Sequence, residues 1–121
     1  MYAPSMAGTQ MQEPTFLILS ALAGGPRHGY ALIEEVGVLS RGSVRLRAGT
    51  LYAALERLVD SGAIAPAGET VVDGRTRRHY ALTDDGAAVL AAEADRLERN
   101  AVIARTGLAR RLAPTTAGGA A

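Results

Sequence analysis

The chain has 121 residues, of which 48% are hydrophobic and 21% are charged, and its formal net charge is +1. This composition is that of one folded domain and excludes a largely disordered protein. Cysteine is absent, which excludes disulfides and thiolate chemistry, and the near-zero charge requires any nucleic-acid contact to rest on local groups of basic residues.

The sequence carries no signal of a membrane protein. No apolar run approaches the length of about 18 residues that a transmembrane helix needs, and no basic segment precedes an apolar one at the N-terminus. The expectation is therefore a cytoplasmic protein with no membrane partner.

Two short helices are expected after an aperiodic tail at residues 1–12. Pro14 suits the first turn of a helix that starts near residue 13, and Gly24-Gly25-Pro26 ends it. A second helix is expected from His28 to about Leu39, because its apolar residues share one face. These residues are Leu32, Ile33 and Val36.

A third helix is expected from about residue 48 to residue 61. Its leucines repeat at helical spacing and form one apolar face, whereas the other face is small and partly basic at its front. Ser61-Gly62 is typical of a helix end. Residues 44–46 alternate in polarity just before it and are expected to form a short strand. The apolar face comprises Leu51, Leu55 and Leu58, and the exposed or half-exposed positions include Ala48, Ala53 and Ala54.

A β-hairpin and a long helix follow. Asp73-Gly74 is a strong turn signal between two extended segments that end near Val72 and Leu82, and Pro66 favours an edge position for the first of them. Thr83 is expected to cap a helix that runs to about residue 112, and a disordered tail is expected at 113–121. Its seam of small and apolar residues has coiled-coil spacing. The predicted dimerisation residues are Leu90, Ala94, Leu97, Ala101, Ala104 and Leu108.

This order of elements predicts a mainly α fold with a small β-hairpin. Residues 13–82 are expected to form a winged helix-turn-helix that binds DNA, and residues 83–112 a long C-terminal dimerisation helix. In such a fold, the helix at 48–61 enters the major groove and the hairpin, or wing, lies beside it.

Several motifs resemble the PadR family of bacterial transcriptional regulators. They occur in family order over about residues 14–108 and are specific only in combination. Arg47-Ala48 stands where the family usually has Ser-Pro, and the chain has no Trp, so the mode in which some relatives hold flat drugs between tryptophans is not carried over. The motifs are Phe16-Leu17-Ile18-Leu19, Gly25-Pro26, His28-Gly29-Tyr30-Ala31-Leu32-Ile33, Gly49-Thr50-Leu51-Tyr52, Gly62, and Gly74-Arg75-Thr76-Arg77-Arg78-His79-Tyr80 leading to Leu82-Thr83 and Gly86.

The candidate DNA-binding residues lie on the third helix, on the wing and at the start of the second helix. Arg supplies a planar fork that suits phosphates and guanine edges. Two questions stay open: whether Tyr30 and Tyr52 contact DNA or pack inside the protein, and whether Arg78 pairs internally. The predicted contacts are Arg47, Thr50, Tyr52, Ala53, Arg57, Arg75, Thr76, Arg77, His28 and Tyr30.

The function predicted from these features is a homodimeric transcriptional repressor that binds a near-palindromic operator in double-stranded DNA. The resemblance also implies release by a small, unidentified effector at the dimer interface. The alternative is a winged-helix module for protein contacts without DNA. An enzyme is not expected, because His28 and His79 are far apart in the chain and neither has a nucleophile at motif spacing. No cofactor and no metal site are predicted.

Overall fold

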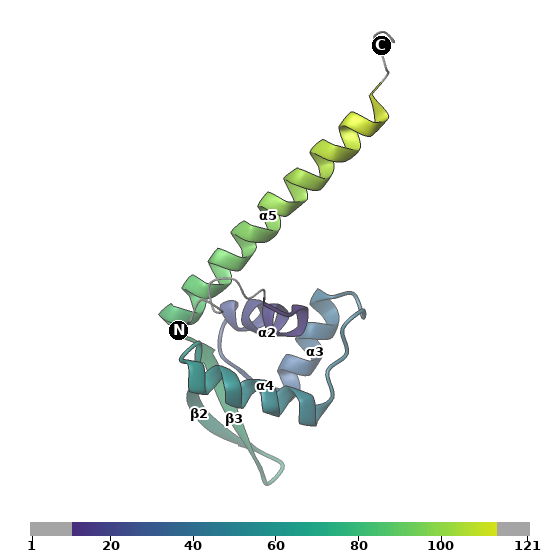
Figure 1. Ribbon diagram of the computed structural model, residues 1–121. Helices are drawn as coiled ribbons and strands as arrows, with labels where there is room; N and C mark the ends of the chain where they lie inside the picture. The colour runs from purple at the N-terminus through teal and green to yellow at the C-terminus, as the bar shows by residue number, and fades with distance from the viewer. Residues whose placement is uncertain (1–10, 114–121) are drawn as a thin grey trace.

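The computed structural model describes residues 11–113. Three short helices form the body, a twisted hairpin extends from one side of it, and the last helix projects far beyond it (Figure 1). The expected tails at 1–12 and 113–121 fall largely outside the described residues. The elements in chain order are α2 (Glu13–Ala23), β1 (Arg27–His28), α3 (Gly29–Leu39), α4 (Ala48–Ser61), β2 (Ile64–Val72), β3 (Arg75–Leu82) and α5 (Asp84–Leu112).

Local sequence signals explain where α2, α3 and α5 begin. Pro14 lies in the first turn of α2, where a missing N–H leaves no hydrogen bond unmade. The side chains of His28 and Thr83 cap α3 and α5 by accepting hydrogen bonds from Ala31 N at 3.2 Å and Gly86 N at 3.0 Å. The expected cap at Thr83 is therefore present.

Helix α4 is amphipathic, as its leucine spacing predicts. Leu51 and Leu55 are fully buried, and Gly62 ends the helix in the left-handed conformation at φ 85°. Ala54 was expected on the exposed side but is buried, because it lies on the same helical face as Leu51 and Leu55. No side chain caps the N-terminus of α4, since the cap position holds Arg47.

The expected strand at residues 44–46 is wrong. These residues are irregular. The backbone N–H of Val44 donates to the hydroxyl oxygen of Ser40 at 3.0 Å and not to a neighbouring strand. The additional strand is β1, which pairs with β3 and places His28 opposite His79. The hairpin is thus part of a three-stranded antiparallel sheet in the order β1-β3-β2.

Strand β2 lies at an edge of the sheet, as Pro66 predicts. Its register with β3 shifts between Pro66 and Glu69, where Gly68 has φ 100°. At the hairpin tip, Asp73 and Gly74 both have positive φ, 52° and 76°, which is the conformation that a two-residue turn of type I′ requires.

One hydrophobic core joins α2, α3, α4 and the sheet. Its largest fully buried side chains come from every helix of the body and from β2, and Tyr80 closes it from β3. Gly86 lets the start of α5 approach the Ala63 carbonyl so closely that no side chain would fit between them. The largest core residues are Ile18, Leu19, Leu32, Leu51, Leu55, Ile64 and Val36.

Helix α5 has two halves in different surroundings. Its first half packs against α2, and Glu93 is buried there beside Arg96, which donates from Nε to Oε1 at 2.9 Å. From residue 97 onward every described residue of the helix is exposed. None of the helices within residues 11–113 is long and apolar enough to span a bilayer.

Candidate nucleic-acid interface

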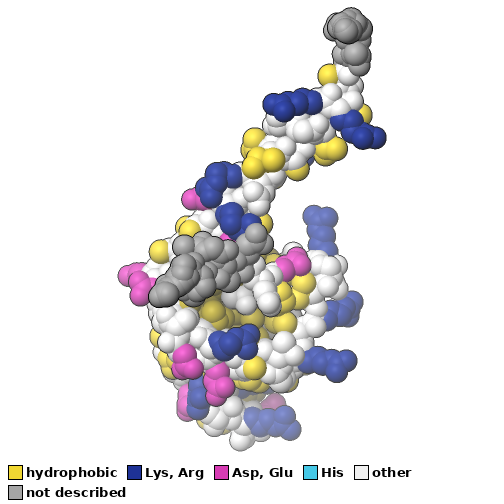
Figure 2. All heavy atoms as spheres, viewed as in Figure 1, with side chains coloured by type: hydrophobic (Ala, Val, Ile, Leu, Met, Phe, Trp, Pro, Cys, Tyr) yellow, Lys and Arg dark blue, Asp and Glu magenta, His cyan; other side chains and the backbone are white. Residues whose placement is uncertain are grey.

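The outer face of α4 is open to solvent and carries small and basic side chains. Arg47, Thr50, Ala53 and Arg57 are all exposed, as a helix that enters a groove requires. In Figure 2, Arg side chains stand out along the edge of the body where the α3–α4 segment runs into α4. Two acids, Glu56 and Asp60, are also exposed, and both lie in the second half of the helix.

Tyr52 belongs partly to the surface and partly to the contact between α4 and α3. Half of the residue is exposed, but its ring lies directly against Gly29, the first residue of α3. A Cβ atom on Gly29 would approach the Tyr52 hydroxyl oxygen to 2.5 Å. A side chain at position 29 would therefore displace the Tyr52 ring from its present position, although the backbone of Gly29 has no positive φ.

The wing carries one exposed arginine next to its tip, Arg75, and one arginine paired with an acid, Arg78. Arg75 and Thr76 directly follow the turn and are exposed. Arg78, whose orientation was left open, points toward β2, where its Nε lies 3.7 Å from a carboxylate oxygen of Glu69. Arg75 is thus the basic group of the wing that stands closest to the tip.

Arg77 connects the wing to α3. Its guanidinium carbon lies 5.8 Å from the ring centroid of Tyr30, a cation–π distance, and its Nη1 lies 3.4 Å from Nε2 of His28. Tyr30 itself is 62% exposed and so does not pack in the core.

The two histidines, which are far apart in the chain, meet at this point. Their ring centroids are 5.4 Å apart in an edge-to-face arrangement, and the ring of His79 also hydrogen-bonds Thr70 on β2 at 2.9 Å. Burial, followed by the charge of Arg77, lowers the pKa of His28 below its usual value. Both influences favour the neutral form of His28.

Sequence reasoning missed Gly29, Thr70 and His79 as members of this site. His79 shares strand parity with Arg77, which signals that both side chains lie on one face of the wing. No sequence signal places His28 opposite them, because the pairing of β1 with β3 joins residues 51 positions apart.

Residues from the start of α3, from α4 and from the wing, among them His28, Tyr52 and Arg77, border one hollow. Its lining contains three arginines and one glutamate, so it carries an excess of positive charge that suits phosphates. The lining residues are His28, Gly29, Tyr30, Tyr52, Glu69, Arg75, Thr76, Arg77, Arg78 and Tyr80.

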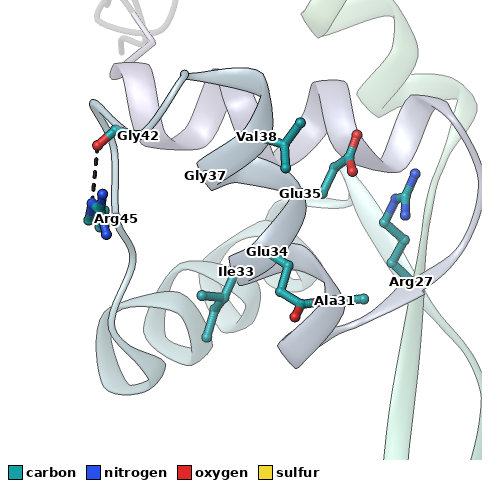
Figure 3. A pocket seen from close by; sticks show the side chains of 9 residues that line it. All are labelled: Arg27, Ala31, Ile33, Glu34, Glu35, Gly37, Val38, Gly42 and Arg45. Carbon is teal, nitrogen blue, oxygen red and sulfur yellow. Dashed lines mark hydrogen bonds between the residues drawn. The ribbon is translucent and has the colours of Figure 1, made fainter.

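A second hollow beside α3 has the same volume, about 720 Å³, but a different charge. Figure 3 shows Glu34 and Glu35 on α3 and Arg27 beside it, while Arg45 donates from Nε to the Gly42 carbonyl at 3.3 Å. Two arginines balance two glutamates in this hollow, so it has no preference for an anion.

The predicted dimerisation residues lie along α5 in both of its halves. Leu90 packs partly against the core of its own chain, and Ala94 is half-buried. Leu97, Ala101, Ala104 and Leu108 are exposed. Figure 2 shows hydrophobic and Arg side chains interspersed along the projecting part of the helix.

The family model for PadR-like transcriptional regulators matches residues 18–92, which include α3, α4 and the whole wing. The chain belongs to the PadR-like family of transcriptional regulators. This membership agrees with the expectation that the chain is not an enzyme, since the family consists of regulators. In the part of the chain that the structure describes, no three His, Cys, Asp or Glu residues gather to hold a metal ion.

Relatives of this PadR-like chain include a transcriptional regulator of Mycobacterium tuberculosis, which is 41% identical over 81 residues, covering 67% of this chain and 72% of the relative. A PadR family regulator from Clostridium difficile has a similar structure, with a TM-score of 0.67 at 24% identity over 80% of this chain and 99% of that one. PadR of Bacillus subtilis, solved in complex with operator DNA, matches with a TM-score of 0.60 at 24% identity over 68% of this chain and 46% of that one. The two structural matches establish the winged-helix fold.

Proposed function

We propose that this PadR-like chain is a homodimeric repressor that binds a near-palindromic operator in double-stranded DNA. Helix α4 lies in the major groove, and the wing contacts the adjacent backbone or minor groove. The observation that carries this proposal is the positively charged hollow in which α3, α4 and the wing meet. The Bacillus subtilis relative, which is bound to its operator, supports it.

The outer face of α4 favours DNA over a protein partner. A helix that docks on another protein needs large apolar anchors, as the hot spots of protein interfaces show. The exposed residues of this face include Arg47, Thr50, Ala53 and Arg57. Tyr52 is the one large, partly apolar side chain exposed on α4. Small side chains at Ala48, Gly49 and Ala53 allow the backbone of α4 to approach the bases.

The projecting part of α5 supports the homodimer. Leu97, Leu108 and Leu112 are exposed apolar residues on a helix that extends away from its own body, and such residues gain stability when a second copy covers them. The acids of α5 lie mostly in its first half, and Arg99, Arg105, Arg110 and Arg111 lie in its second half. A dimer presents two α4 helices to half-sites about 34 Å apart, one turn of the double helix.

The release of the repressor by a small effector is part of the same proposal. Alanines at 94, 101 and 104 leave room between two α5 helices, and a molecule inserted there changes the spacing of the two α4 helices. The chain acts in the cytoplasm, where the operator is accessible.

The test is a mobility-shift titration of the DNA upstream of the chain's own gene against a scrambled duplex, with wild type and Arg57→Ala. Wild type is expected to prefer the upstream duplex, and Arg57→Ala to lose mainly this preference. The preference of wild type for the upstream duplex is also expected to disappear when a small molecule that binds between the α5 helices is added. If wild type binds neither duplex at low salt, or both equally, the proposal is wrong. Equal losses of Arg57→Ala on both duplexes would assign Arg57 to a phosphate.

A further inference from the structure

Each ring nitrogen of His28 faces a hydrogen-bond donor of another residue. Nδ1 accepts from the backbone N–H of Ala31 at 3.2 Å, and Nε2 faces Nη1 of Arg77 at 3.4 Å. Arginine donates only and has no acceptor atom. A neutral imidazole has one acceptor and one donor nitrogen, so His28 satisfies only one of these two neighbours.

The backbone contact decides which nitrogen carries the proton. The N–H of Ala31 lies in the first turn of α3, where the helix itself offers no acceptor, and it cannot turn away. Arg77 has four further N–H groups on a flexible stem and has the ring of Tyr30 as a second partner. His28 is therefore the tautomer with the proton on Nε2. Two donors, His28 Nε2–H and Arg77 Nη1–H, then converge, and no residue within 11–113 places an acceptor between them.

We propose that His28 Nε2–H and the Arg77 guanidinium bind the same phosphate oxygen of the DNA backbone, with His28 neutral. The proposal rests on the DNA-binding function proposed above. Both groups border the positively charged hollow between α3, α4 and the wing, so a backbone phosphate beside α4 reaches them. In this arrangement, the hydrogen bond from Ala31 N–H to Nδ1 orients the His28 ring, and Arg77 on the wing supplies the positive charge.

The charged neighbours agree with a neutral His28. Arg77 and His79 face it from β3, and both disfavour a second proton, while Glu34 on α3 acts weakly in the opposite direction. Together with burial, they hold the pKa of His28 below its usual value. Glu69 borders the same hollow from β2, but its carboxylate is paired with Arg78.

A first experiment addresses the tautomer in the free protein. Imidazole ¹⁵N resonances of His28 distinguish the two neutral forms near neutral pH, and a hydrogen on Nε2 is expected. A hydrogen on Nδ1, or a doubly protonated ring, would overturn the inference without any reference to DNA. Addition of operator duplex is then expected to shift the Nε2 resonance. Inorganic phosphate at the same phosphate concentration is expected to leave it in place, and an equal shift would assign the site to free phosphate.

A second experiment separates the donor from the cap. His28→Asn keeps an oxygen that caps α3 but removes Nε2–H, so the melting temperature is expected to stay close to wild type. Operator affinity is expected to fall roughly tenfold, with an unchanged salt slope, because a neutral donor releases no counterion. Arg77→Gln is expected to lower the slope by about 0.9.

The double variant completes the test. If one phosphate binds both groups, the losses of His28→Asn and Arg77→Gln are expected to be less than additive. Additive losses, or an unaltered affinity of His28→Asn while wild type binds the operator, would overturn the inference and leave the proposed function intact. If wild type binds no duplex, the proposed function itself fails, and the phosphate site fails with it.

Discussion

The ring of Tyr52 on α4 occupies the space beside Gly29 in which a side chain on the first residue of α3 would stand. This contact connects the two helices of the helix-turn-helix at their surface, above the core leucines. Because half of Tyr52 remains exposed, the same contact places a tyrosine hydroxyl at the edge of the positively charged hollow.

Gly29→Ala is expected to displace Tyr52 without unfolding the protein. The new Cβ would lie 2.5 Å from the hydroxyl oxygen, and a half-exposed ring is free to swing outward. Unfolding free energy is expected to change by less than about 1 kcal/mol, whereas operator affinity falls severalfold. The matched control is Gly37→Ala in the same helix, where a Cβ meets no atom within 4 Å and stability is expected to rise by about 0.5–1 kcal/mol. Urea denaturation and fluorescence anisotropy measure the two quantities, and wild-type affinity in Gly29→Ala would remove Tyr52 from the interface.

Arg75→Ala is expected to weaken binding to every duplex, whatever its sequence. Arg75 is the exposed arginine next to the wing tip, and its loss leaves one phosphate unneutralised. The slope of log affinity against log salt concentration is expected to decrease by about 0.9. Arg110→Ala removes the same charge from the far end of α5 and is expected to leave affinity unchanged. An identical slope in wild type and Arg75→Ala would exclude a phosphate contact by this residue.

Leu97→Glu is expected to split the homodimer. Leu97 is 42% exposed on the face of α5 that carries the predicted seam, where a carboxylate would be buried against a second copy. Operator affinity is expected to fall by about 10²-fold or more, because two linked half-sites become two separate ones. Val102→Glu, about 140° around the helix from Leu97, is the control and is expected to remain dimeric. Light scattering coupled to size exclusion measures the mass, and a dimeric Leu97→Glu would mean that the seam lies elsewhere.

Arg47→Ser is expected to make the protein more stable and its DNA binding weaker. Arg47 occupies the cap position of α4 with extended backbone angles, φ −90° and ψ 153°, but provides no capping hydrogen bond. A serine hydroxyl there is expected to add about 1 kcal/mol of unfolding free energy. Arg47→Ala removes the charge without adding a cap, so it is expected to show the same loss of affinity and no gain in stability. Equal stability of the two variants would contradict the capping argument.

Acid is expected to lower the stability of the protein through Glu93, which pairs with Arg96 within α5. The hydrogen bond from Arg96, together with the backbone N–H of Met11, lowers the pKa of Glu93 below 4.5. A carboxyl with a lowered pKa contributes stability that is present above its unfolded value and is lost as pH falls through the folded value. The melting temperature of Glu93→Gln is therefore expected to be lower than that of wild type at neutral pH and to approach it below pH 4.5. Glu98→Gln, an exposed acid on the same helix, is expected to show no such difference at any pH.

Local signals predicted most of the elements. Four of these signals each act within a few residues, so they can be recognised from the sequence alone. They are the leucine period of α4, the left-handed glycine at its end, the Asp73-Gly74 turn and the Thr83 cap. Residues 44–46 alternate in the same way as a strand, yet none of the strands in the described part of the chain pairs with them. Alternating polarity indicates that a segment has one apolar and one polar side, but the segment becomes a strand only when a neighbouring strand forms hydrogen bonds with it.

The sequence by itself determined the helical spans, the hairpin and its arginines, and the candidate groove helix, because side-chain period and turn chemistry are local properties. The tertiary structure decided which distant residues meet. The pairing of β1 with β3 brings His28 to His79 and Arg77, and the packing of α4 on α3 brings Tyr52 to Gly29. These contacts depend on burial of a core shared by several elements, and no spacing within one element encodes them.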